Sequence, residues 1–78
     1  MKVTEDQALA DIADQMNIPV AEVDHELDLR DQGMDSVRVM ELVEKWRSEG
    51  VTKVDFIQLA EDQRVTHWLT VLRELQRA

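Results

Sequence analysis

Hydrophobic residues recur at helical spacing near the start of the chain. Within residues 4–17 they fall at i, i+3, i+4 and i+7, on one face of a helix, and they are Leu9, Ile12, Ala13 and Met16. Thr4 and Gln7 have the spacing of a capping box, in which two side chains satisfy backbone N–H groups at a helix start. Asn17 and Pro19 interrupt the pattern. We therefore expect a first helix over residues 4–17.

The second half of the chain predicts two long helices and a short one. A stripe with the same spacing favours a helix over 35–49, with Gly50 past its end, and consists of Val39, Leu42, Val43 and Trp46. Asp55 is a candidate N-cap of a short helix that reaches Ala60, and Asp62 a candidate N-cap of the last helix. One side of that last helix is lined by Val65, Trp68, Leu69, Leu72 and Leu75.

Residues 20–34 lack a sustained helical period, because acidic residues separate single apolar ones. We expect a long loop held on the core by its leucines, Leu27 and Leu29. A loop of this length in a small domain is usually functional or a misread element, and the sequence leaves open whether it holds a helical turn. The predicted fold class is all-α, with residues 1–78 forming a single domain. It is a four-helix bundle with three main helices, one short helix and a long loop between the first and second.

Charge and composition narrow the range of partners. The 78 residues carry 17 acidic and 9 basic side chains, for a formal net charge of −8. Such a surface repels phosphate backbones and anionic lipid, so we expect no nucleic-acid and no membrane binding. The sequence has no cysteine, no signal-peptide pattern and no apolar stretch near the roughly 20 residues that span a bilayer. We expect a cytoplasmic monomer.

Two apolar residues of the second predicted helix lie off its core stripe. On a wheel of about 100° per residue, Met40 and Val37 point roughly 110° and 170° away from the centre of that stripe. They share a flank with Ser36. Either the long loop covers them or they belong to a docking surface.

The chemistry that Ser36 could support is limited. A serine nucleophile needs a base within hydrogen-bond reach, and His25 and His67 lie in no catalytic motif. The acidic residues around Gly33 lack the ligand spacing of a calcium loop, so no metal site is predicted. Modification by another enzyme remains, because a hydroxyl just after the N-cap candidate Asp35 is open and the N–H groups there can receive an attached phosphate. The alternative is that Ser36 simply fills the first helical turn.

The run Gly33-Met34-Asp35-Ser36-Val37-Arg38 resembles the phosphopantetheine attachment site of carrier proteins. The resemblance covers about residues 4–76 and points to an aryl carrier protein of the nonribosomal peptide synthetases that build catechol siderophores. The residues that match this type are Met40, Leu42, Trp46-Arg47, Asp55-Phe56, Leu59-Ala60 and Trp68. The chain departs from the pattern by one extra residue before Phe56 and by Asp62-Gln63-Arg64 in place of a common Asn-Pro.

The resemblance implies that Ser36, with Asp35 as part of the motif, carries 4′-phosphopantetheine from coenzyme A, attached by a phosphopantetheinyl transferase that uses magnesium. It implies two further partners, an aryl-acid adenylating enzyme and a condensation domain of a nonribosomal peptide synthetase. The residues expected to contact partners are Val37, Arg38, Met40, Phe56 and Ala60.

The chain would then be a free-standing carrier without enzyme activity that holds 2,3-dihydroxybenzoate or salicylate as a thioester for siderophore assembly. A peptidyl, fatty-acyl or polyketide carrier is the nearby alternative. An unmodified helical interaction module is the alternative from another class.

Overall fold

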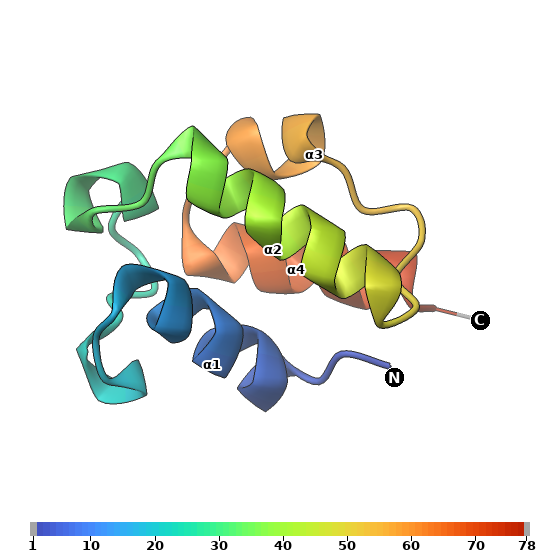
Figure 1. The fold of residues 1–78 in the computed structure, drawn as a ribbon, viewed down its shortest axis with the longest axis horizontal. Helices are drawn as coiled ribbons and strands as arrows, with labels where there is room; N and C mark the ends of the chain where they lie inside the picture. The colour runs from blue at the N-terminus through green and yellow to red at the C-terminus, as the bar shows by residue number, and fades with distance from the viewer. Residues whose placement is uncertain (1, 78) are drawn as a thin grey trace.

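The structure is a computed structural model that describes residues 2–77, and these residues form helices and connections without a β-strand. The α-helices are α1 (Glu5–Met16), α2 (Ser36–Ser48), α3 (Phe56–Ala60) and α4 (Val65–Leu75). α1 runs antiparallel to α2 and α4, and the short α3 contacts both α2 and α4 (Figure 1). The predicted all-α bundle of three main helices and one short helix is confirmed. No helix within residues 2–77 has the length and apolar character needed to cross a bilayer.

The long helices turn their apolar stripes inward. The stripe predicted for the second helix is buried throughout, at Val39, Leu42, Val43 and Trp46. Trp46 packs edge to face against Trp68, with ring centroids 6.4 Å apart. Both indole N–H groups have acceptors, since Trp46 donates to the Asp11 carboxylate at 2.9 Å and Trp68 to the Leu59 carbonyl at 2.8 Å. The core is therefore aliphatic around one aromatic pair whose polar atoms are satisfied.

The capping box predicted at Thr4 forms only in part. Thr4 accepts the N–H of Gln7, but the Gln7 side chain donates to the Glu49 carboxylate at 2.6 Å and so ties α1 to the end of α2. A complete capping box forms at α3, where the side chains of Asp55 and Gln58 each accept a backbone N–H of the other. A helix as short as α3 has few internal hydrogen bonds, so this box fixes where it begins.

The N-cap predicted for the last helix is wrong. α4 begins after Arg64, whose side chain makes no capping hydrogen bond. The Asp62 carboxylate instead accepts the backbone N–H of Arg64 at 3.2 Å and pairs with its guanidinium at 2.6 Å. This local turn uses the aspartate before the helix starts. The Arg64 side chain, by its hydrogen bond, lowers the pKa of Asp62 to about 2.

The long loop holds two single-turn 3₁₀ helices, η1 (Val20–Glu22) and η2 (Leu29–Gln32). Leu29 is fully buried, and its N–H donates to the Gln63 carbonyl at 2.7 Å, which joins the loop to the α3–α4 connection. Leu27, by contrast, is 46 % exposed, so the expectation that both leucines hold the loop was wrong for Leu27. Val23 and Met34 are buried in its place.

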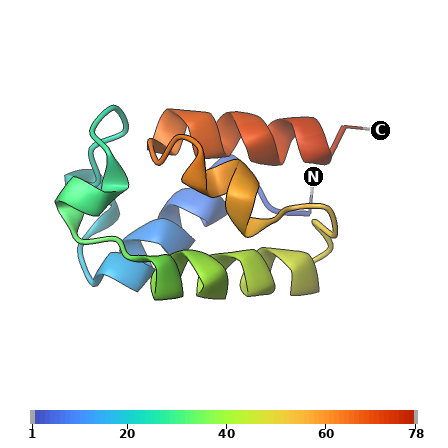
Figure 2. The ribbon, with the colours of Figure 1, turned by 90° about the horizontal axis from the view of Figure 1, so that it is seen from above.

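The loop places the start of α2 at one end of the bundle. Figure 2 shows the loop and the first turn of α2 together at that end, with both chain ends at the other. The chain ends are joined by the Gln76 side chain, which accepts the N–H groups of Lys2 and Val3, each at 2.8 Å. Ser36 therefore stands at a corner of the bundle, away from the termini.

Candidate functional site

Ser36 is the first residue of α2, and its side chain is exposed. The helix begins here because Asp35 has an extended backbone and its carboxylate accepts the N–H of Arg38 at 2.9 Å. Among the described residues none makes a hydrogen bond with the Ser36 hydroxyl. The predicted N-cap is confirmed, and the hydroxyl is open to solvent.

Buried residues on either side hold this exposed turn in place. Met34 and Val39 are 4 % and 0 % exposed, so the motif is anchored before and after Ser36. Gly33 has φ 106°, a left-handed conformation that a side chain would strain, and this turns the chain from η2 into the motif. The serine thus lies in a turn that buried residues anchor on both sides.

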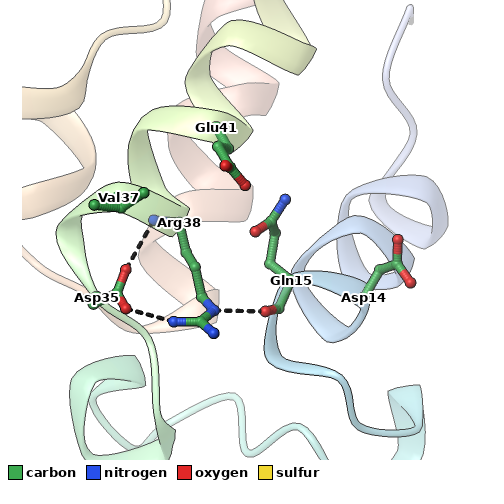
Figure 3. Close-up of a pocket in the computed structure, with 6 residues that line it drawn as sticks. All are labelled: Asp14, Gln15, Asp35, Val37, Arg38 and Glu41. Atoms are coloured by element: carbon green, nitrogen blue, oxygen red, sulfur yellow. Dashed lines mark hydrogen bonds and ion pairs between the residues drawn. The ribbon is translucent and has the colours of Figure 1, made fainter.

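The guanidinium of Arg38 lies against the motif aspartate. It pairs with the Asp35 carboxylate, and its Nε donates to the Gln15 carbonyl at 2.9 Å (Figure 3). The N–H of Arg38, and then its positive charge, lower the pKa of Asp35. These groups border an open pocket of about 340 Å³, which is lined by Asp14, Gln15, Asp35, Val37, Arg38 and Glu41.

An exposed apolar surface runs from α2 to α3. Val37 and Met40 are 63 % and 53 % exposed, so the loop does not cover them. Ile57 on α3 is 68 % exposed, although it was not among the residues predicted to contact partners. The helical period could have found Ile57, because it lies two positions, or about 200° on the wheel, from the buried Leu59.

A groove of about 390 Å³ lies between α2 and α3 and brings the predicted Met40 and Phe56 together. Its lining consists of Met40, Val43, Glu44, Arg47, Asp55 and Phe56. Phe56 is half-buried against the core. Ala60 is also half-buried but lines neither this groove nor the pocket beside Asp35.

In the part of the chain that the structure describes, neither histidine is hydrogen-bonded to Ser36. His25 is exposed in the loop, while His67 Nε2 lies 3.2 Å from the Gln58 carbonyl. The described residues also contain no group of three or more His, Cys, Asp or Glu side chains that could hold a metal ion. The site offers an accessible hydroxyl at a helix start with an apolar surface beside it.

The protein family described as "Phosphopantetheine attachment site" matches residues 6–72. Isochorismatase of Bacillus subtilis (strain 168) is 51 % identical over 45 residues, which is 58 % of this chain and 14 % of that protein. Phenyloxazoline synthase MbtB of Mycobacterium sp. (strain MCS) is 33 % identical over 73 residues, 92 % of this chain and 6 % of the synthase.

One relative has a similar length. Acyl carrier protein ScoB of Streptomyces coeruleorubidus is 36 % identical over 74 residues, 95 % of this chain and 86 % of ScoB. The chain therefore spans a small part of the isochorismatase and of the synthase, and most of ScoB. No solved structure matches it.

Proposed function

The chain belongs to the phosphopantetheine attachment-site family, and on this premise we propose that it is an aryl carrier protein modified at Ser36. Proteins of this family hold covalently attached 4′-phosphopantetheine, and the carrier domain is not itself catalytic. The acyl group we propose is 2,3-dihydroxybenzoate or salicylate. The observation that carries the proposal is the exposed Ser36 hydroxyl at the start of α2, inside the matched residues.

The residues around Ser36 fit the attached group. The hydroxyl is sterically open, and the positive end of the α2 dipole favours a phosphodiester there. The negative charge of Asp35 would oppose that phosphate, but it is paired with the guanidinium of Arg38. When bound, the group supplies a thiol that holds an acyl group as a thioester. A flexible tether at this corner raises the effective concentration of that acyl group at each partner.

The name of one relative supports the aryl assignment. Phenyloxazoline synthase is named for a phenyl-bearing product, and it contains a segment like this chain. ScoB carries the wider name acyl carrier protein. A peptidyl, fatty-acyl or polyketide carrier therefore remains the alternative that the loading experiment must distinguish.

We propose that partners bind an apolar docking face on α2 and α3. This docking face consists of the exposed Val37, Met40 and Ile57 together with the half-buried Phe56 and Ala60. The charged groups Glu44, Arg47 and Asp55 border the groove beside it. A small apolar centre with a charged rim suits an interface that must release one partner before binding the next. The partners proposed are a phosphopantetheinyl transferase, an aryl-acid adenylating enzyme and a condensation domain.

Mass spectrometry of the intact protein tests the attachment. With coenzyme A, magnesium and a broad-specificity transferase, we expect the mass to rise by one phosphopantetheine. The Ser36→Ala variant should keep its helical circular dichroism and gain nothing. A wild-type chain that stays unmodified, or a variant that is still modified, would refute Ser36 as the site.

Loading of the modified protein tests the acyl group. It is incubated with adenylating enzymes for aryl acids, amino acids and fatty acids in turn. An aryl thioester alone supports the proposal, whereas an amino-acyl or fatty-acyl thioester without an aryl one excludes it.

A charge on the docking face tests how partners bind. Met40→Asp and Ile57→Asp should leave modification of Ser36 in place but lower acyl transfer to the condensation domain about tenfold, because each places a charge in the apolar centre of the interface, where hot-spot residues cluster. Leu27→Asp is the control, because Leu27 is 46 % exposed, close to the 53 % of Met40, yet lies in the long loop. Equal transfer by all three variants would exclude the docking face.

A further inference from the structure

The Arg38 side chain forms hydrogen bonds with other residues of this chain. Its Nε donates to the Gln15 carbonyl at 2.9 Å, and one terminal nitrogen pairs with an oxygen of Asp35. The other oxygen of Asp35 accepts the backbone N–H of the same arginine at 2.9 Å. Figure 3 shows these bonds joining the first turn of α2 to the last turn of α1. One residue thus holds the N-cap of one helix and the C-terminus of another.

The end of α1 lacks a cation of its own. The last four carbonyls of a helix have no intrahelical donor, and the last turn of α1 contains no basic residue. N–H groups of the first two residues past the helix satisfy the carbonyls of Ala13 and Asp14. Arg38 supplies the donor for Gln15, and it places a positive charge where the helix dipole favours one.

The link also closes the long loop. It joins residues 23 positions apart, so it spans the whole connection between α1 and α2. The backbone before Ser36 is otherwise anchored by the buried Met34 and Leu29. Without Arg38, Asp35 could still cap α2, but it would lose both its tie to α1 and its counter-charge.

We infer that Arg38 is a positioning residue. It fixes the start of α2, and with it Ser36, relative to the end of α1. This inference rests on the proposed modification of Ser36. The Arg38 side chain also neutralises Asp35 beside the point where a negatively charged phosphodiester would be attached. Lysine cannot replace it, because a single ammonium group does not reproduce the planar set of donors that reaches a carboxylate and a carbonyl together.

Amide hydrogen exchange in the unmodified protein tests whether Arg38 positions the start of α2, independently of any modification of Ser36. Arg38→Gln should raise the hydrogen-exchange rates of the amides at positions 38 and 39 about threefold to tenfold. Both amides donate to Asp35, and their hydrogen bonds should open more easily once Asp35 has lost its link to α1. Arg38→Lys should not restore the protection. The control is Arg77→Gln, which removes one positive charge from an exposed pair with Glu74 and should leave these amides unchanged. Unchanged protection in both Arg38 variants would overturn the inference.

The kinetics of modification test the consequence for Ser36. With saturating coenzyme A, Arg38→Gln should lower kcat about threefold to tenfold and leave KM within about twofold, because a poorly placed hydroxyl reacts less often in the bound complex. A raised KM with unchanged kcat would overturn the inference and would instead indicate the partner contact predicted from the sequence. If the wild-type chain is not modified at all, the proposed function fails, and the exchange rates still decide whether Arg38 positions the start of α2.

Discussion

The two leucines of the long loop provide a matched pair for testing what holds the Ser36-bearing segment on the bundle. Leu29 is 0 % exposed and Leu27 is 46 % exposed, although they are the same residue type two positions apart. The N–H of Leu29 also donates to the Gln63 carbonyl at 2.7 Å. The substitutions Leu29→Ala and Leu27→Ala therefore remove the same atoms from very different surroundings.

The expected loss of stability differs severalfold between Leu29→Ala and Leu27→Ala. Replacing a buried leucine by alanine costs about 2–5 kcal/mol, because the side chain loses its burial and leaves a cavity. A domain of this size has a free energy of unfolding of roughly 4–12 kcal/mol, so Leu29→Ala removes a large share of it. A loss of about 3 kcal/mol in the free energy of unfolding lowers the Tm by roughly 12–24 °C. Leu27→Ala should change the free energy of unfolding by no more than about 0.5 kcal/mol, as exposed positions usually do.

Urea unfolding followed by tryptophan fluorescence measures the difference. Trp46 and Trp68 are both fully buried, so their emission reports the loss of the core. We expect the midpoint of Leu29→Ala to fall while its slope stays near that of the wild type, and the Leu27→Ala curve to overlay the wild type. Equal losses in the two variants would refute the assignment of Leu29 alone as the anchoring leucine.

Three further predictions concern other parts of the structure. Trp68→Phe leaves the Leu59 carbonyl without its donor and should destabilise the protein by about 1–3 kcal/mol in urea titrations; an unchanged midpoint would contradict this. Asp55→Ala removes the capping box of α3 and should cost about 1 kcal/mol, with faster amide exchange in that helix alone; slow exchange there would show that the cap is dispensable. Arg64 lowers the pKa of Asp62 to about 2. The ionised Asp62 carboxylate therefore stabilises the fold at pH values above 3.8, its pKa in the unfolded chain, and this stabilisation fades as the pH falls toward 2. The difference in urea midpoint between wild type and Asp62→Asn should therefore narrow over that range, and a constant difference would exclude the pairing.

Much of the fold could be read from local pattern. Apolar positions at helical spacing predicted α1, α2 and α4, and Asp55 marked the start of α3. The same period predicted that Val37 and Met40 point away from the core, and both are exposed. These features follow from 3.6 residues per turn, which is a property of the chain within each helix.

Several errors concern side chains with more than one available partner. Asp62 was expected to cap α4, but it binds Arg64 two residues away. Gln7 was expected to complete a capping box, and it reaches Glu49 at the end of α2 instead. Polar side chains can satisfy several donors or acceptors of similar energy, so the choice depends on which groups the fold brings near.

Helical period and capping, which act over a few residues, specify a small helical bundle with a serine at the start of its second helix. Packing between distant elements decides that Leu29 rather than Leu27 enters the core, that Met40 and Phe56 meet at one groove, and that Arg38 turns to the end of α1. Each of these depends on surfaces from elements distant along the chain. Burial and long-range hydrogen bonds exist only after those elements pack, and no spacing within one helix specifies them.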